Sequence, residues 1–311
     1  MRITHGLHYM AAASTAITIG NFDGVHLGHR LMLQRLDAHA RHHRQTVTVL
    51  SFEPHPREWF APEQAPARLS SLRDKLACLQ QLGVDHVHIL PFNAQLAAMT
   101  AHEFVENLLL RQFHMQHLVV GDDFCFGARR AGNIDLLQQL GKQNHYSLDI
   151  VPGLTKNGTR ISSTAIRTAL ADANLELAKQ MLGRPFSISG HVVHGDKRGR
   201  ELGFPTANLR ILSVTPPLTG VFYVQIRLSS EQVFPAVANL GVRPTLNDGK
   251  KSRLEVHIPD FSGNLYGRIV QVTFLAHIRA ERSFTSLDAL RHQIAADVAQ
   301  MRDIFRLPVS A

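Results

Sequence analysis

The stretch ITIGNFDGVHLGHRLML (residues 17–33) joins a short apolar run, a glycine-rich turn and an amphipathic segment. This order predicts a strand, a turn and a helix that begins near His26. His26 and His29 are three residues apart, so they share one face of the first helical turn. That turn also offers unpaired backbone N–H groups and the positive end of the helix dipole. The stretch therefore predicts a phosphate site at which two imidazoles can donate hydrogen bonds.

Apolar runs alternate with helical patterns from Ile17 to about Ile150. The runs are AITIGNF, TVTVLSF, HVHILPF, HLVVGDDF and LDIVP, and the helical segments lie around residues 27–40, 69–82, 102–113 and 134–140. Strands that alternate with helices at this spacing predict a parallel sheet with crossover helices, and hence an α/β fold. Ligands of such sheets bind at the carboxyl ends of the strands, where the turn before His26 would lie.

The pattern changes after Pro152. Residues 161–182 are helical in pattern, and GRPF at 183–186 ends that segment. The β-rich runs FSISGHVVHG, GVFYVQIRL, QVFPAVANLG, RLEVHIP and RIVQVTFLAHI then follow one another closely, which predicts an antiparallel barrel or sandwich. A last helix is expected from Thr285 to Phe305, with Thr285 and Asp288 as its N-terminal cap. We therefore expect two domains, residues 1–183 and 184–311.

Charge and cysteine content limit the classes of protein. The 33 Lys and Arg residues outnumber the 25 Asp and Glu residues, and this net charge of +8 favours anionic partners. Cys78 and Cys125 form no CxxC pair, which argues against a disulfide framework and favours a reducing compartment. No signal sequence is evident, and no window reaches the roughly 20 apolar residues that span a bilayer. We expect a cytoplasmic protein without a membrane partner.

A second phosphate motif is predicted in RISSTAIR (residues 160–167). The hydroxyl groups of Ser162, Ser163 and Thr164 would lie at the start of a helix, with Arg167 one turn further on. Hydroxyl and guanidinium donors at such a position can hold phosphate oxygens. An ordinary helix cap is the alternative explanation for these hydroxyl groups.

These two motifs resemble those of the HxGH nucleotidyltransferase superfamily, whose Rossmann-like domains bring a nucleophile to the α-phosphate of a nucleoside triphosphate and expel pyrophosphate. SFEPHPREWF (51–60), VGDDFCFGARRAGN (120–133) and GTRISSTAIR (158–167) narrow the resemblance to the adenylyltransferase domain of the prokaryotic bifunctional riboflavin kinase/FAD synthetases. GHVVHGDKRGRELGFPTANL (190–209), AVANLGVRPT (236–245), LEVHIPDFSGNLYG (254–267) and FLAHIRAERSF (274–284) resemble their riboflavin kinase domain. The resemblance covers nearly the whole chain.

The resemblance implies residue roles in the first domain. His26 and His29 would be catalytic. ATP and its phosphates would contact Gly20, Asn21, Phe22, Asp23, Gly28, Ser162, Ser163, Thr164 and Arg167. The flavin would contact Pro54, Pro56, Phe60, Asp123 and Phe126. Aromatic and proline residues near strand ends suit the apolar slot that a flavin ring needs. The alternative is that these aromatic residues belong to the core and anchor loops.

The second domain contains no Walker P-loop, so a kinase there must hold ATP differently. The resemblance implies ATP contacts at Gly195, Lys197, Gly199, Gly203, Thr206 and Asn208. Thr206 and Asn208 would also hold Mg²⁺, since their neutral oxygens lie on one side of an extended segment. Glu255, which faces the same way as His257, would be the general base. An ion pair with a neighbouring Arg is the alternative for Glu255. Arg279 and Glu281 would lie near the flavin.

The expected reactions are the phosphorylation of riboflavin to FMN by the second domain and the transfer of AMP to FMN by the first. Riboflavin, FMN and ATP are the expected partners, and no nucleic acid or obligate protein partner is expected. A nucleic-acid-binding protein is the alternative class, because the chain is basic. Its basic residues are scattered, however, and the barrel lacks the aromatic and basic run of a stacking surface. A gel shift with tRNA at physiological salt discriminates between the two classes.

Overall fold

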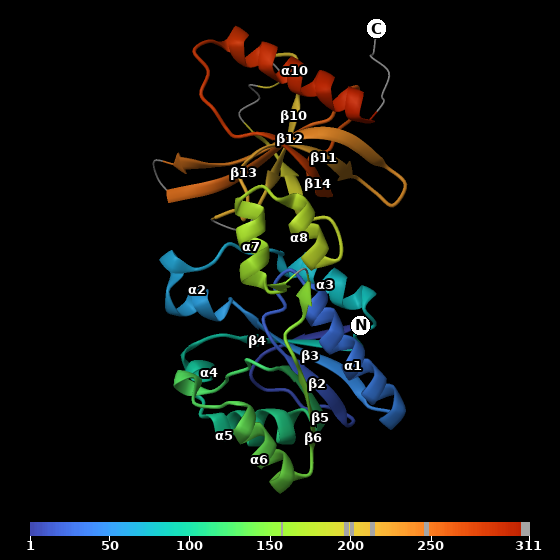
Figure 1. Ribbon diagram of the computed structural model, residues 1–311, viewed down its shortest axis with the longest axis vertical. Helices are drawn as coiled ribbons and strands as arrows, with labels where there is room; N and C mark the ends of the chain where they lie inside the picture. Colours follow the sequence, from blue (N-terminus) through green and yellow to red (C-terminus); the bar gives the residue numbers. More distant parts are fainter. Residues whose placement is uncertain (157, 196–198, 200–201, 212–214, 246–248, 306–311) are drawn as a thin grey trace. The chain divides into compact units, whose positions relative to one another are not determined.

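The computed structural model describes residues 1–156, 158–195, 199, 202–211, 215–245 and 249–305, and it leaves the side chains of residues 242–251 undescribed. Contacts divide the chain into two compact units, each of which is described by itself (Figure 1). Unit 1 comprises residues 1–66 and 75–162, and unit 2 comprises residues 67–74 and 163 onward. Residues 163–182 are thus grouped with the barrel. The domain limits of 1–183 and 184–311 remain a prediction.

Unit 1 is built on a six-stranded parallel sheet in the order β1-β4-β3-β2-β5-β6. The strands are β1 (Arg2–His5), β2 (Thr15–Ile19), β3 (Thr46–Glu53), β4 (His86–Pro91), β5 (Met115–Gly121) and β6 (Ser147–Val151). The parallel sheet is as predicted. The edge strand β1 was not predicted, because its four residues, RITH, carry no apolar run.

Helices lie on both faces of this sheet (Figure 1). They are α1 (Leu27–His43), α2 (Pro56–Phe60), η1 (Pro62–Gln64), α3 (Leu72–Gln81), α4 (Ala94–Ala98), α5 (Ala101–Glu103), the π-helical segment η2 (Phe104–Gln112), η3 (Ala128–Arg130) and α6 (Ile134–Asn144). A small hairpin, β7 (Thr155–Lys156) and β8 (Thr159–Arg160), follows the sheet. On one face, Ile17 and Leu118 of the sheet pack with Leu108 of η2 and Leu137 of α6 in a buried core. Such burial stabilises a fold by roughly 25 cal/mol per Å² of apolar surface removed from water.

Unit 2 contains a closed barrel in the strand order β10-β13-β12-β11-β14-β9, and all of its pairs are antiparallel. The strands are β9 (Ser187–Val193), β10 (Thr206–Arg210), β11 (Gly220–Arg227), β12 (Val233–Thr245), β13 (Gly249–His257) and β14 (Ile269–Arg279). Of the two predicted alternatives, an antiparallel barrel or a sandwich, this confirms the barrel. On the barrel packs α10 (Leu287–Phe305), whose buried Val298 and Met301 contact Val221, Tyr223 and Val237.

Two helical segments differ in detail from the expectation. The helical pattern of residues 161–182 forms two helices, α7 (Ser163–Ala171) and α8 (Leu175–Leu182). The side chain of Asn174 caps α8 by accepting a hydrogen bond from the Leu177 N–H, so a new helix begins there. Likewise, the residue that caps α10 is Ser286 rather than Thr285, because Ser286 Oγ accepts from the Ala289 N–H at 3.1 Å. No helix in the described ranges is long and apolar enough to cross a membrane.

Candidate active sites

The two histidines of the HxGH motif cap the helix and each other. His26 is the N-cap of α1, and its Nδ1 accepts a hydrogen bond from the His29 N–H. In return, His29 Nδ1 accepts from the His26 N–H at 3.3 Å, and the two rings stack with centroids 3.6 Å apart. Each bond requires a lone pair on Nδ1, so each neutral ring carries its proton on Nε2. Both Nε2–H groups are thus set as donors.

The turn before α1 holds these rings in place. Phe22 and Val25 have left-handed φ angles of 48° and 41°, a conformation that is uncommon outside glycine, and both are fully buried. Gly24 has a φ of 81°. A Cβ at Gly28 would lie 3.1 Å from the His26 ring, so a side chain there would press on the imidazole. The buried residues thus fix a backbone that presents the His26 and His29 rings.

A polar row continues from this turn to β3 and α3. Ser51 Oγ donates to the Asn21 carbonyl oxygen at 3.4 Å, and Lys75 Nζ lies 3.4 Å from Ser51 Oγ. Lys75 is buried, and buried lysines are almost always paired. The Oδ1 atom of Asn21 is buried and has no hydrogen-bond partner among the described residues. Asn21 was predicted to contact ATP, whereas Ser51 and Lys75 were not singled out.

The second motif lies at the division between the units. Gly28 and Ile161 approach each other in unit 1, since a Cβ at Gly28 would be 4.0 Å from the Ile161 carbonyl oxygen. Ser162 belongs to unit 1, whereas Ser163, Thr164 and Arg167 belong to unit 2. Arg167 Nε donates to the Ala67 carbonyl oxygen at 2.6 Å. A joint phosphate site of both motifs therefore stays a prediction.

The candidate flavin residues of unit 1 differ in exposure. Phe126 is only 6% exposed and stacks on Phe124, with ring centroids 5.6 Å apart. Phe126 is therefore part of the core, which was the alternative explanation for it. Asp123 is largely exposed, and its carboxylate lies 3.2 Å from the guanidinium of Arg160. Arg160 also pairs with Asp122, and hydrogen bonding to the Gly153 N–H is the main cause that lowers the pKa of Asp122.

The other flavin candidates lie after β3. Pro54 follows a cis peptide bond, and Pro56 is the first residue of α2. Phe60 ends that helix and is 68% exposed, with its ring 5.5 Å from that of Phe92. An exposed ring beside a second aromatic ring suits contact with a planar ligand. Phe92 was not singled out from the sequence, because it lies beyond the strand end in a stretch without a motif.

In the barrel, register brings the kinase candidates together. Asn208 of β10 is the partner of Glu255 of β13, and Thr206 is the partner of His257. Asn239 of β12 is the partner of Glu255 on its other side. Paired residues of neighbouring strands point to the same face of a sheet, so these five residues form one polar surface. Asn239 was not predicted, and its buried Oδ1 atom has no hydrogen-bond partner in the described part of the chain.

Two glycines lie against this polar surface. A Cβ at Gly195 would overlap the amide of Asn208, and a Cβ at Gly199 would overlap the Phe204 carbonyl oxygen and lie 3.3 Å from Thr206 Oγ1. Any other residue at Gly195 would therefore displace the Asn208 amide, and one at Gly199 would press on the Phe204 backbone. Gly203, with a φ of 85°, needs glycine for its backbone conformation instead. Lys197 lies outside the described residues.

Glu255 forms an ion pair with an Arg, which was the alternative to its role as general base. Its carboxylate lies 2.6 Å from Arg253 Nε, and the two side chains are 24% and 25% exposed. The same guanidinium also donates to Asn208 Oδ1 from Nε and Nη2, at 3.0 and 2.9 Å. An ion pair does not by itself prevent a carboxylate from accepting a proton. The role of Glu255 as a base therefore stays a prediction.

Arg279 and Glu281 lie where β14 leads toward α10. Arg279 pairs with the buried carboxylate of Asp297 on α10, with Nη2 and Oδ2 2.8 Å apart. The carboxylate of Glu281 lies against Gly241, where a Cβ would overlap it. Arg279 thus anchors α10 to the barrel. The predicted flavin contacts of Arg279 and Glu281 are untested.

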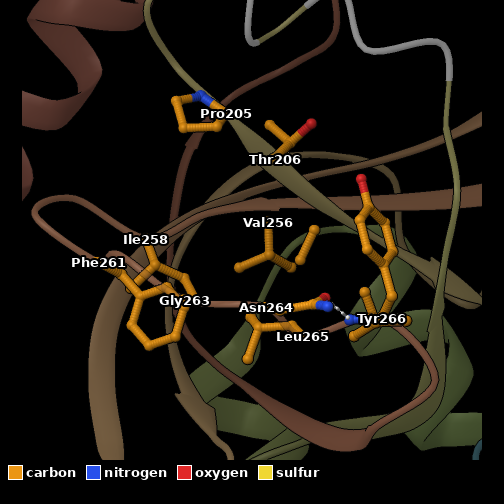
Figure 2. A pocket seen from close by; sticks show the side chains of 11 residues that line it. Pro205, Thr206, Val256, Ile258, Phe261, Gly263, Asn264, Leu265 and Tyr266 are labelled. Atoms are coloured by element: carbon orange, nitrogen blue, oxygen red, sulfur yellow. Dashed lines mark hydrogen bonds between the residues drawn. The ribbon is translucent and has the colours of Figure 1, made fainter.

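A pocket opens beside β10 and β13, and Thr206 of the polar surface is among the residues that line it (Figure 2). Ala207 and Val256, which alternate with Asn208 and Glu255 along their strands, line it. The polar groups at the pocket come from residues that include Thr206, Asn264 and Tyr266, and apolar residues make up most of the remaining lining: Val192, Pro205, Ile258, Phe261 and Leu265. Asn264 Oδ1 accepts from the Tyr266 N–H at 3.0 Å, which ties down the segment that forms this wall. The pocket suits a planar, mostly apolar group with a few polar atoms.

Comparison with known proteins finds two family models, one for each half of the chain. The family model for FAD synthetase matches residues 9–165, and the model for riboflavin kinase matches residues 182–305. The chain is 46% identical over 310 residues to a bifunctional riboflavin kinase/FMN adenylyltransferase of Escherichia coli (strain K12), covering 99% of both chains. It is 44% identical to the protein of the same name from Haemophilus influenzae, covering 98% of this chain and 99% of the relative.

One solved structure extends over nearly the whole fold. It is the crystal structure of a macrolide-efflux protein from Streptococcus pneumoniae. The two share 30% identity with a TM-score of 0.83, and the alignment covers 97% of this chain and 99% of the other. Both the parallel sheet and the barrel therefore have a counterpart in one solved chain.

The chain combines a Rossmann-like sheet that carries the HxGH motif with a closed barrel that carries a polar surface. With the two family matches, these folds identify a two-domain transferase that acts on flavins and nucleotides. Within that class, the chain belongs to the bifunctional riboflavin kinase/FMN adenylyltransferase family.

Proposed function

We propose that the chain makes FAD from riboflavin in two ATP-dependent steps, one on each of the domains 1–183 and 184–311. Riboflavin and ATP give FMN and ADP on the second domain, and FMN and a second ATP give FAD and pyrophosphate on the first. The observation that carries the proposal is that each of two separate folds is matched by its own family model, and that each holds a group of the candidate residues. Riboflavin, FMN and ATP are the proposed partners.

In the adenylyl transfer, an oxygen of the FMN phosphate attacks the α-phosphate of ATP. The bond from that phosphorus to the bridging oxygen breaks, and pyrophosphate leaves. Charge builds on the phosphate oxygens during the attack, and donors set in advance stabilise it. We assign this role to the Nε2–H groups of His26 and His29, which their Nδ1 contacts leave as donors. Ser162, Ser163, Thr164 and Arg167 would hold the leaving pyrophosphate.

In the kinase step, the terminal ribityl hydroxyl attacks the γ-phosphate of ATP and ADP leaves. Glu255 would accept the hydroxyl proton, because it lies beside the phosphate-binding candidates of β10. The buried Oδ1 of Asn239, next to Glu255, would accept a hydrogen bond from the substrate. We assign the adenine ring to the pocket beside Tyr266, which Thr206 also lines.

Magnesium is the metal we propose for the barrel. Thr206 and Asn208 would hold it, since a hydroxyl and an amide oxygen on one strand face fit a hard cation that keeps phosphate and water ligands. Gly195 supports this assignment, because a Cβ there would overlap the Asn208 amide and move it from its position. When bound, the ion neutralises phosphate charge. In the described part of the chain, no group of three or more His, Cys, Asp or Glu residues is placed to hold a metal.

The proposal is tested by incubating the full chain with riboflavin, ATP and Mg²⁺ and separating the products by chromatography. FMN should appear first and FAD later, and EDTA should stop FMN formation. Conversion of added FMN to FAD without any use of riboflavin would refute the kinase assignment, and accumulation of FMN alone would refute the adenylyltransferase assignment. We place the protein in the cytoplasm, where its two free cysteines, Cys78 and Cys125, would stay reduced.

A further inference from the structure

Arg253 joins two groups of the proposed kinase site. Its Nε lies 2.6 Å from the Glu255 carboxylate, and its Nε and Nη2 both donate to Asn208 Oδ1, at 3.0 and 2.9 Å. Asn208 is buried, whereas Arg253 and Glu255 are each about three-quarters buried. A guanidinium keeps its charge at any physiological pH, so these are charge-assisted contacts.

Hydrogen bonds at both ends of the Asn208 amide fix its orientation. Its Nδ2 donates to the Thr206 carbonyl oxygen at 3.4 Å, and its Oδ1 faces the guanidinium. The reversed amide would place an NH₂ group against the N–H groups of Arg253, which offers no hydrogen bond. The oxygen that we assign to magnesium is therefore the atom that Arg253 occupies.

An amide oxygen has two lone pairs, and here two N–H groups already point to it. A divalent cation at the same oxygen would also lie next to the positive guanidinium, and like charges repel at this distance. Arg253 and a metal ion therefore compete for Asn208 Oδ1. Without the guanidinium, Glu255 and Asn208 would instead present an uncompensated carboxylate and a free amide oxygen, which together attract a cation.

We propose that Arg253 is a positioning residue that occupies the metal ligand Asn208 while the site holds no nucleotide, and that it withdraws from Oδ1 when metal and nucleotide bind. The inference rests on the proposed role of Asn208 as a magnesium ligand. Before nucleotide binds, Arg253 keeps Asn208 and Glu255 in one hydrogen-bonded unit and excludes the free cation. A metal ion that arrives bound to ATP already has phosphate oxygens among its ligands, whereas a free ion does not.

The test measures Mn²⁺ alone, as a spectroscopic substitute for Mg²⁺, by electron paramagnetic resonance with the full chain and no nucleotide. R253Q should bind Mn²⁺ about fivefold more tightly than the wild type, a change of about 1 kcal/mol. The matched control is R227Q, an Arg-to-Gln change on β11, which should leave Mn²⁺ affinity unchanged. R253K keeps a positive charge beside Asn208 and should stay close to the wild type. A melting curve checks that each variant is folded, and R253M replaces R253Q if that variant does not fold.

Double substitution identifies the atom involved. If Arg253 blocks Asn208, then R253Q/N208A should lose the gained affinity. A gain that persists in the double variant would show that only the charge of Glu255 matters, and this outcome would overturn the inference, as would an R253Q variant without any gain. The proposed function is tested separately by kinase activity of N208A at high Mg²⁺. Normal activity there would remove Asn208 as a magnesium ligand, whatever the Mn²⁺ result.

Discussion

Replacing His117 by Gln should make unit 1 less sensitive to acid. His117 lies on β5 and is only 5% exposed, and its ring stacks on that of His39 with centroids 3.5 Å apart. Its Nδ1 is 2.7 Å from Ser147 Oγ. Burial, followed by the positive charge that His39 can carry, lowers the pKa of His117 to about 4. Gln keeps a polar group near Ser147 but does not titrate.

The size of the effect follows from the two pKa values of His117. In the unfolded chain the imidazole has a pKa of 6.5, and in the folded chain it has a pKa of about 4. Above pH 6.5 both states are neutral and the fold keeps its full stability. As the pH falls below 6.5, the unfolded state binds a proton that the folded state refuses until about pH 4. At pH 5 the gap of roughly 1.5 pH units, at about 1.36 kcal/mol each, lowers the free energy of unfolding by about 2 kcal/mol.

Urea denaturation of the wild type and of H117Q at pH 8 and pH 5 measures this loss. Trp59, the single Trp of the chain, lies in unit 1 and reports its unfolding by fluorescence, with circular dichroism as a second probe. The loss of stability between the two pH values should be about 2 kcal/mol smaller in H117Q. Part of the acid sensitivity should remain, because burial also lowers the pKa of His86 to about 4. H102Q, at an exposed histidine of α5, is the control, and equal losses in H117Q and the wild type would refute the argument.

Three further predictions concern catalysis and domain structure. H29A should lower FAD formation from added FMN by about a hundredfold, because it removes a transition-state donor, and should leave FMN formation nearly unchanged. Product chromatography measures both activities, and an equal loss of both contradicts the assignment. A fragment that begins near Pro185 should fold alone and phosphorylate riboflavin, and a fragment that begins at Ser163 serves for comparison. If the Pro185 fragment is insoluble or inactive while the full chain is active, the two halves share a core or a site. E255Q should lose most of its kcat for FMN with little change in KM and should still convert supplied FMN to FAD; steady-state kinetics with near-normal turnover would remove Glu255 from the mechanism.

The sheet and the barrel could be predicted because hydrophobic patterns repeat along the chain and depend on few long-range details. Details that one local contact decides could not be predicted. The four residues of β1 have no pattern of their own and form a strand only because β4 offers a free edge. Residues 161–182 have a helical pattern throughout, yet Asn174 caps a second helix and divides the segment.

For the sites, spacing predicted which side chains lie together but not the bonds between them. The interval between His26 and His29 places both rings on the first turn of α1, as expected. Their mutual capping depends on the extended backbone of His26, with a ψ of 175°, which no residue spacing indicates. Asn239 escaped notice for a similar reason, because its position beside Glu255 is a matter of strand register between β12 and β13.

Glu255 shows how two explanations that compete in a sequence can hold together in a structure. The ion pair with Arg253 is present, and the same carboxylate lies beside Asn208, the proposed metal ligand. A buried carboxylate beside a buried amide oxygen is stabilised by a cation between them, because an uncompensated buried charge is costly. Arg253 supplies that cation from within the chain. The ion pair therefore does not argue against Glu255 as the base.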